Sequence, residues 1–351
     1  MSRLADHYEA VREHNGYDRV AGIDWLAPLE RRFVAVGGRE TVAAARERPT
    51  LVCMGAGLTG PPHLGTVGQL LTGVALQEAG LDVQFVLADL EPYHGGADRE
   101  RVRRLAERYR AFALDLGFAP DRGTLRTQSE ARDVMATGHR LARYYAPDEW
   151  DGADDPGTAW SEAVAEAYDR GRPGDDREAT DGDGGDDRAA PTSEAADAHS
   201  AVLHGADFLH PLAEGSYEQV VVALGVDEHG LTPWTREFRD AASVSGRVAG
   251  LHTRMIPGFD GPKMSKSIDA GVSLAADPER VRERVATAPD GGGPSESAVF
   301  AAMCLASRYD ADDLAELATD CEAGGEAWAA ARAEYADEAA ALARRWRATA
   351  D

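Results

Sequence analysis

The sequence predicts an α/β protein with a doubly wound parallel sheet and a small helical domain at its C-terminal end. The main observation is a set of short apolar runs, which are typical of strands buried on both faces. They cover 51–54, 83–89 and 219–224, with a weaker strand expected at 124–128 and a last strand and turn at 252–259. Helical periodicity lies between the runs, for example from about 98 to 116. Strands that alternate with helices favour a parallel sheet.

Four segments follow from these patterns. Residues 1–50 are expected to form a polar, helical N-terminal extension that packs against the rest of the chain. The sheet domain covers 51–275, and a helical domain covers 276–351, beginning at Asp277-Pro278, a typical helix start. Within the sheet domain, about 170–195 is dense in Asp, Gly and Pro, so we expect a disordered acidic insertion there.

The chain is strongly acidic. It has 351 residues, with 37 Lys and Arg against 61 Asp and Glu, and a formal net charge of −24. This balance argues against a nucleic-acid partner at ordinary salt, because such proteins usually present a basic surface. At molar salt the Debye length shrinks to about 3 Å. We therefore expect a halophilic source, in which an acidic protein can still meet RNA.

The composition also indicates in which cellular compartment the protein is expected. No apolar run approaches the roughly 20 residues that span a membrane, and the N-terminus lacks the apolar region of a signal peptide. The three cysteines, Cys53, Cys304 and Cys321, are scattered and predict neither a zinc cluster nor a disulfide framework. We expect a cytoplasmic protein that does not associate with membranes.

The stretch after the first strand suggests a phosphate site. Gly55 and Gly57 follow the strand, and a helix begins at His63. A helix N-terminus offers unpaired backbone N–H groups and a positive dipole end, both of which suit phosphate. His63 could donate a further hydrogen bond there. On this stretch alone, a plain tight turn explains the pattern equally well.

Polar residues follow two of the other strands and lie on one helix. Asp89 ends the second strand, and Asp227 follows the strand at 219–224, where a carboxylate can bind a ribose hydroxyl. His204 and Asp207 are three residues apart, so they share one face of a helix. The alternative interpretations are a satisfied turn and an ordinary surface helix. No second His or Cys cluster accompanies His229, so we expect no dedicated protein metal site.

The second informative stretch is Gly261-Pro262-Lys263-Met264-Ser265-Lys266-Ser267, in which Lys263 lies 200 residues after His63. Two lysines in a glycine-flanked loop suit a reaction whose charge builds up on a pyrophosphate in the transition state. PHLG followed by KMSKS resembles the paired motifs of class I aminoacyl-tRNA synthetases, and the order and spacing resemble their tryptophanyl/tyrosyl subgroup. Leu64 and Thr66 depart from the His-Ile-Gly-His form of the first motif.

The resemblance implies a Rossmann-like catalytic domain that joins an amino acid to ATP, releases pyrophosphate and passes the aminoacyl group to tRNA. It implies a homodimer, with Mg²⁺ accompanying ATP rather than held in a protein cage. The implied catalytic residues are His63, Thr66, Lys263 and Lys266. The implied ATP-binding residues are Gly55, Gly57, His63, Gly65, Gly225, Asp227, Met255, Lys263, Ser265 and Lys266. The implied amino-acid-binding residues are Asp89, His204, Asp207 and Glu228.

Within the subgroup, the resemblance favours tryptophan and tRNA(Trp). Gly225–Glu228 with Thr235-Arg236 is similar to a tryptophanyl element, although Glu228 replaces its Gln. Ala206-Asp207 is similar to the pair whose Asp contacts the indole N–H, and tyrosyl enzymes have an Asp there for the phenol. The strand end at 87–90 resembles archaeal tyrosyl enzymes, and His204 matches neither group.

Tyrosine therefore remains the alternative substrate. Two further alternatives are a nucleotidyltransferase that never meets tRNA and a non-catalytic paralogue. The complete KMSKS and the helical C-terminal domain count against the first. Thr66, Glu228, His204 and the acidic charge keep the second open.

Overall fold

The computed structural model describes residues 3–146, 194–259, 272–289 and 292–350. Its centre is a six-stranded sheet in the order β1-β6-β5-β2-β3-β4. The strands are β1 (Phe33–Gly37), β2 (Thr50–Gly57), β3 (Asp82–Ala88), β4 (Gly123–Thr127), β5 (Gln219–Val222) and β6 (Arg247–Thr253). The strands β2 to β6 pair in parallel, and β1 pairs antiparallel to β6 at the edge. The predicted parallel sheet is confirmed, with one antiparallel edge strand added.

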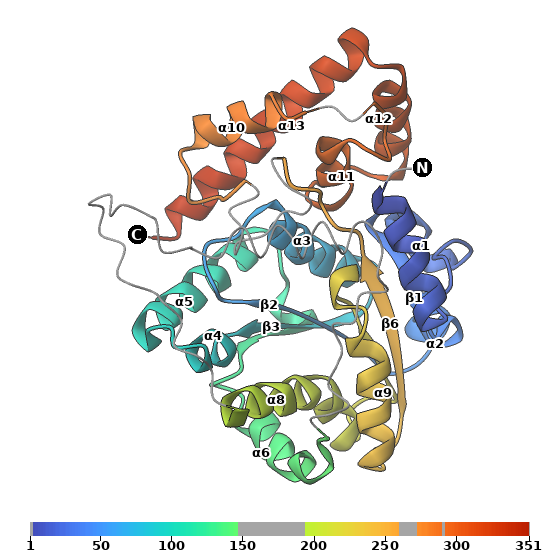
Figure 1. The fold of residues 1–351 in the computed structure, drawn as a ribbon, viewed down its shortest axis with the longest axis vertical. Coiled ribbons are helices and arrows are strands. Elements are labelled where there is room, and N and C mark those ends of the chain that lie inside the picture. The colour runs from blue at the N-terminus through green and yellow to red at the C-terminus, as the bar shows by residue number, and fades with distance from the viewer. Residues whose placement is uncertain (1–2, 147–193, 260–271, 290–291, 351) are drawn as a thin grey trace.

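Helices cover both faces of the sheet (Figure 1). The larger ones in this part of the chain are α3 (Leu64–Glu78), α5 (Arg99–Asp115), α6 (Arg132–Leu141), α8 (Glu194–Ala213) and α9 (Leu231–Ala241). Alternate residues of β2 reach opposite layers, as the two-residue period of a strand requires. Val52 and Met54 join the core that includes α3, whereas Leu51 and Cys53 join the core that includes α8 and α9. The sheet is therefore buried on both faces, as its apolar runs predict.

Two strands differ from the sequence-based expectation. Residues 33–37 form β1 rather than part of a helix, because this apolar, valine-rich segment pairs with β6 along the edge of the sheet. The last strand runs over 247–253 instead of beginning at 252. In addition, β2 continues through Gly55 and Gly57, predicted as a turn, because β3 pairs with it as far as Ala88.

The rest of the described N-terminal segment contains four helical elements. They are α1 (Arg3–Asn15), η1 (Asp24–Arg32), α2 (Arg39–Ala43) and η2 (Ala44–Arg46). Short elements at the strand ends are α4 (Leu90–His94), η3 (Pro120–Arg122), η4 (Ala142–Tyr144) and η6 (Val226–Glu228).

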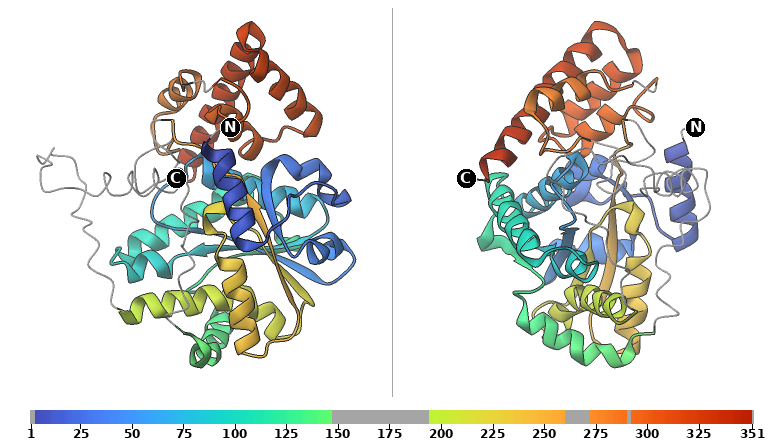
Figure 2. Two further views of the ribbon diagram at one scale, coloured as in Figure 1. Left: turned by 45° about the vertical axis from the view of Figure 1, so that its right-hand side comes forward. Right: turned by 60° about the vertical axis from the view of Figure 1, so that its left-hand side comes forward.

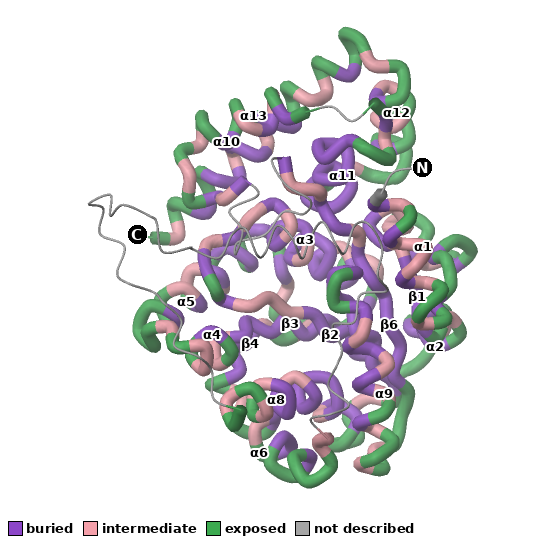
Figure 3. Tube along the Cα trace, in the orientation of Figure 1, coloured by how far each residue is buried: buried purple, intermediate pink, exposed green. Residues whose placement is uncertain are grey.

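The C-terminal segment is helical, as predicted, and stacks at one end of the molecule (Figure 2). It contains α10 (Pro278–Ala286), α11 (Ala298–Leu305), α12 (Ala311–Ala323) and α13 (Gly325–Ala348). Buried Arg32 ties it to the N-terminal segment by donating to the carbonyl oxygens of Leu305 (2.5 Å) and Ser307 (2.7 Å). Buried residues of the sheet, α3 and α11 belong to one hydrophobic core, and buried positions predominate in α3 and α11 (Figure 3).

Two predictions concern segments outside the described residues. The acidic insertion at about 170–195 falls there except for its last two residues, which begin α8. The lysine loop with Lys263, Ser265 and Lys266 also lies outside them. None of the described helices is long and apolar enough to cross a membrane.

Candidate active site

A cavity of about 170 Å³ opens where β2 and β3 end, at the carboxyl edge of the parallel sheet. This edge is where open α/β sheets bind their ligands. The lining residues come from the ends of β2 and β3, from α8 and from the segments that follow β3, β4 and β5. They are Met54, Gly55, Ala56, Gly57, Val86, Ala88, Glu91, Gln128, His204, Asp207, Phe208, Leu224 and Glu228. Three of the four residues predicted to bind the amino acid, His204, Asp207 and Glu228, thus line one cavity.

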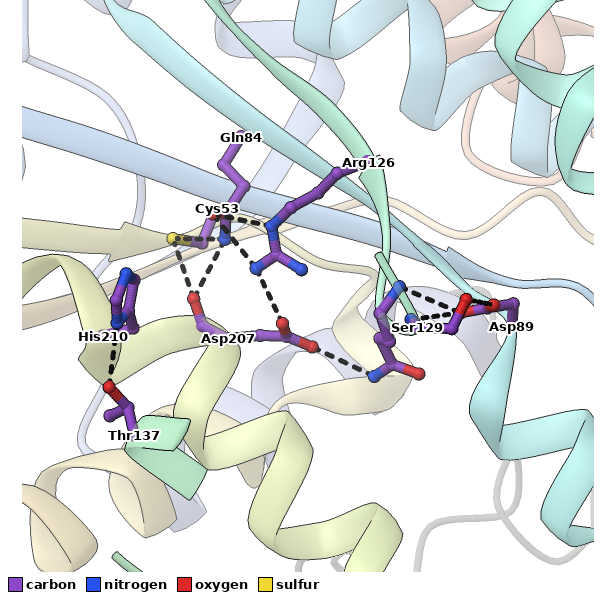
Figure 4. Close-up of polar contacts among 9 residues, drawn as sticks. Cys53, Gln84, Asp89, Arg126, Ser129, Thr137, Asp207 and His210 are labelled. Carbon is purple, nitrogen blue, oxygen red and sulfur yellow. Dashed lines mark hydrogen bonds and ion pairs between the residues drawn. The ribbon is translucent and has the colours of Figure 1, made fainter. Parts of the chain in front are cut away.

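Asp207 is the buried charge of this cavity. Its side chain is 4% exposed and forms an ion pair with Arg126, with Nη2 2.7 Å from Oδ1. Its Oδ2 accepts a hydrogen bond from Gln128 Nε2 at 3.0 Å. Gln84 completes the cluster: Nε2 donates to the Asp207 carbonyl oxygen (2.9 Å), and Oε1 accepts from Arg126 Nη2 (3.2 Å). Figure 4 shows Asp207 reaching from α8 toward Arg126 on β4.

Each polar side chain of this cluster offsets the cost of burying another. A buried carboxylate is tolerated only when it is paired and hydrogen-bonded. Arg126 supplies the charge, and Gln128 and Gln84 supply hydrogen bonds. Asp207 is therefore a paired residue of the cavity wall.

Asp89, which the resemblance implies to be amino-acid-binding, does not line the cavity. Its carboxylate accepts hydrogen bonds from the backbone N–H groups of Gln128 (2.9 Å) and Ser129 (3.1 Å) and from the Ser129 hydroxyl (Figure 4). These contacts fix the turn that follows β4. Asp89 thus holds Gln128 in place from behind the cavity.

Arg126 and Gln128 are the site residues that sequence reasoning missed. The segment 124–128 is predicted as a weak strand, and polar residues at the ends of parallel strands face the ligand crevice. The same rule that selected Asp89 would have selected Gln128. Glu91, which that rule does select because it follows β3, also lines the cavity.

His63 caps the first turn of α3, as the sequence suggests. Its Nδ1 accepts a hydrogen bond from the Thr66 backbone N–H at 3.3 Å. In the neutral imidazole the proton is then on Nε2, which is the donor. A Cβ at Gly65 would lie 2.8 Å from His63 Cε1, so only glycine leaves room for this ring.

Thr66, which the resemblance implies to be catalytic, lies in the first turn of α3. It is buried, and so is Tyr109, whose hydroxyl donates to the Gly60 carbonyl oxygen at 3.0 Å. Burial raises the pKa of Tyr109, so that phenol stays protonated. The side chain of Thr66 therefore points into the core, and its backbone N–H is the group directed to His63.

The described segment that follows the lysine loop lies against this cap. Ser273 pairs with His63 in an isolated antiparallel bridge, and the Leu274 N–H donates to the Pro62 carbonyl oxygen at 2.9 Å. The chain thus returns from the loop directly beside the first motif, although the two are far apart in sequence.

The remaining predicted ATP-binding residues lie near this edge but do not line the cavity. Asp227 is exposed in η6, and a Cβ at Gly225 would overlap its carboxylate. Met255 is buried, and its backbone is engaged by Tyr8 of α1: its N–H donates to the phenol oxygen (3.0 Å), and the phenol lies 3.4 Å from its carbonyl oxygen. Burial raises the pKa of Tyr8 to about 12, so the phenol keeps its proton.

No group of three His, Cys, Asp or Glu residues suited to a metal ion occurs among the described residues. The polar donors near the edge are the His63 imidazole and the backbone N–H groups at the start of α3. These groups suit a phosphate rather than a bare cation.

Residues 45–144 match the family model described as tRNA synthetases class I (W and Y). The chain is 29% identical over 328 residues to a tryptophan–tRNA ligase from Methanopyrus kandleri, covering 85% of this chain and 77% of that protein.

Solved structures show the same fold. The tryptophanyl-tRNA synthetase from Aeropyrum pernix K1 matches with a TM-score of 0.74 and 19% identity, covering 97% of this chain and 94% of that one. The tyrosyl-tRNA synthetase from Archaeoglobus fulgidus, complexed with L-tyrosine, matches with a TM-score of 0.64 and 19% identity, covering 94% and 99%. The chain is therefore tryptophanyl-tRNA synthetase-like: a homologue of a tryptophan–tRNA ligase, with the fold that the tryptophanyl and tyrosyl enzymes share.

Proposed function

We propose that this chain is an aminoacyl-tRNA ligase that activates tryptophan with ATP and transfers it to tRNA(Trp). The observation that carries the proposal is the position of the cavity. It lies at the carboxyl edge of the sheet with a buried polar cluster, and the same strand, β2, leads to the helix that His63 caps. An aromatic amino acid in the cavity would bring its carboxylate toward the site where ATP phosphates can bind.

The reaction needs no covalent enzyme intermediate. The amino-acid carboxylate attacks the α-phosphate of ATP, pyrophosphate leaves, and the aminoacyl group then passes to the 3′ end of tRNA. The protein contributes positioning and electrostatic stabilisation. The His63 Nε2–H and the backbone N–H groups of α3 are the proposed phosphate donors, with Lys263 and Lys266 acting on the developing pyrophosphate charge. Mg²⁺ would neutralise part of the phosphate charge when it arrives with ATP.

The α-amino group of the substrate has carboxylates available to it. Glu91 and Glu228 both line the cavity and are both exposed, Glu91 in the first turn of α4 and Glu228 at the end of η6. An ammonium group at the cavity mouth is attracted to them, and solvent exposure spares them the cost of a buried charge. Glu228 thereby keeps a role in amino-acid binding although it replaces the Gln of the related motif.

Tyrosine is the second candidate substrate, because a tyrosyl enzyme complexed with L-tyrosine has a similar fold. Both side chains present a hydrogen-bond donor at the end of an aromatic ring, which suits a cavity with buried acceptors. Neither an aliphatic amino acid nor phenylalanine offers such a donor.

The further expectations are a homodimer in the cytoplasm of a halophile. A net charge of −24 opposes RNA binding at low salt, whereas molar salt screens that repulsion beyond about 3 Å. Activity on tRNA should therefore require concentrated KCl.

The test is ATP–pyrophosphate exchange with each of the twenty amino acids in molar KCl, followed by charging of total tRNA. Tryptophan should support the fastest exchange, and the same amino acid should appear on tRNA. Exchange without charging would favour a nucleotidyltransferase. Absence of exchange with every amino acid would favour a non-catalytic paralogue.

A further inference from the structure

Gln128 is a buried side chain whose hydrogen bonding is half complete. It is 4% exposed and lines the cavity. Its Nε2 donates to Asp207 Oδ2 at 3.0 Å, and its backbone N–H donates to Asp89 Oδ1 at 2.9 Å. Within the part of the chain that the structure describes, its Oε1 has no hydrogen-bond partner.

The orientation of this amide is determined by its neighbour. An ionised carboxylate can only accept, so the NH₂ group of Gln128 must face Asp207. Arg126 Nη2 pairs with Asp207 Oδ1 at 2.7 Å and holds this carboxylate in place, and Gln84 in turn holds Arg126. The Oε1 atom is therefore fixed as an acceptor directed away from Asp207.

A fixed, buried acceptor without a partner costs free energy in the empty protein, unless a water or a ligand supplies a donor. The cavity is polar and borders Gln128, so a ligand that enters can supply the hydrogen. Arg126 also has a buried Nη1 without a partner among the described residues, but it does not line the cavity. The acceptor that meets the ligand is thus on Gln128.

We propose that Gln128 Oε1 accepts the hydrogen bond from the donor at the end of the substrate ring, the indole N–H of tryptophan or the phenol O–H of tyrosine. Asp207 acts through Gln128 as a positioning residue, with Asp89 holding the backbone behind it. This inference rests on the proposed function for the substrate class. It changes which residue reads the side chain: a neutral amide oxygen rather than the carboxylate.

The experiment compares each donor-bearing amino acid with a ring of similar shape that lacks the donor. The pairs are tryptophan against β-(3-benzothienyl)alanine, in which sulfur replaces the N–H, and tyrosine against phenylalanine. Affinities are measured by calorimetry and activation by pyrophosphate exchange, both in molar KCl. In the wild type, the donor-bearing member of one pair should be preferred at least about 10-fold in both assays.

Gln128→Met keeps the length of the side chain and removes the acceptor. It should reduce that preference about 10-fold or more, mainly through weaker binding of the donor-bearing member, and leave the donor-free member within about 3-fold. Gln128→Asn, which keeps an amide but withdraws it by one methylene, should have the same effect. The control is Gln77→Met, because Gln77 is also buried and hydrogen-bonded but lies in α3 away from the cavity. It should leave the preference unchanged.

Asp207→Asn tests the positioning role. An asparagine that still accepts from Arg126 presents its NH₂ group to Gln128, so the Gln128 amide turns and offers a donor to the ligand. The preference should then collapse although Gln128 is intact. Retained preference in Gln128→Met and Gln128→Asn would overturn the inference.

The same measurements distinguish a failure of the ligase proposal from a failure of the inference about Gln128. If the wild type binds tryptophan or tyrosine but catalyses no exchange, the ligase proposal fails, and the calorimetric preference still decides the role of Gln128. If the wild type shows no preference within either pair, the inference is wrong even where exchange is fast.

Discussion

The buried ion pair between Arg126 and Asp207 predicts a large loss of stability when only its cation is removed. The two side chains are 11% and 4% exposed, so Arg126→Met leaves the Asp207 charge without compensation and away from water. Breaking a buried pair in this way costs about 3–5 kcal/mol. With an m-value of about 3 kcal/mol per M, the urea midpoint should fall by about 1–2 M.

The matched control is Arg103→Met. Arg103 is 57% exposed on α5 and bridges Glu100 and Glu107, and exposed pairs contribute about 0–1 kcal/mol. Urea unfolding of both variants is measured at low and at molar KCl. Salt should change the effect of Arg103→Met but not that of Arg126→Met, because salt screens the exposed pairs but not the buried one. The double variant Arg126→Met with Asp207→Leu should recover part of the loss. If Arg126→Met were no less stable than Arg103→Met, our description of the cavity wall as a compensated charge cluster would be wrong.

Three further predictions concern the helix cap, the lysine loop and pH. Gly65→Ala should displace the His63 ring, cost about 1 kcal/mol of stability as a lost cap and slow adenylation, and His63→Ala should slow it too. Gly60→Ala, where a Cβ meets open space, should do neither. Lys266→Ala should lower the adenylation rate about 10²-fold with little change in amino-acid affinity, and an unchanged pre-steady-state rate would remove the loop from the mechanism. Burial lowers the pKa of His252 in the folded protein to about 3. In the unfolded chain the imidazole gains its proton below about pH 6.5. The free energy of unfolding therefore decreases as the pH falls below about 6.5. In urea titrations His252→Phe should lose about 2 kcal/mol less than the wild type between pH 6.5 and 5, and equal losses would contradict the assignment.

The parallel sheet could be predicted from the sequence because its signal is local. Each strand that is buried on both faces reads as an unbroken apolar run, as β2, β3 and β5 do. The His63 cap is equally local, since glycine, helix start and capping residue are neighbours in the chain. The edge strand β1 was missed because its identity depends on β6, a partner more than 200 residues away.

The cavity wall could be predicted only in part, for a related reason. Asp207 was found from its position on α8, but its state depends on Arg126 from β4, and no spacing in the sequence links the two. Asp89 was placed at the correct edge of the sheet, yet its carboxylate faces the turn after β4 instead of the cavity. The ends of the strands indicate which residues gather at a site. The hydrogen bonds and ion pairs among those side chains decide which of them remain available to a ligand.

The most direct test of the account is a crystal structure with a non-hydrolysable analogue of tryptophanyl-adenylate. We expect the indole ring in the cavity between β2, β3 and α8, with its N–H within about 3.2 Å of Gln128 Oε1 and the phosphate-mimicking group within hydrogen-bond reach of His63. An analogue bound elsewhere, or one whose ring lies in the cavity with both contacts beyond about 3.5 Å, would contradict the central claim.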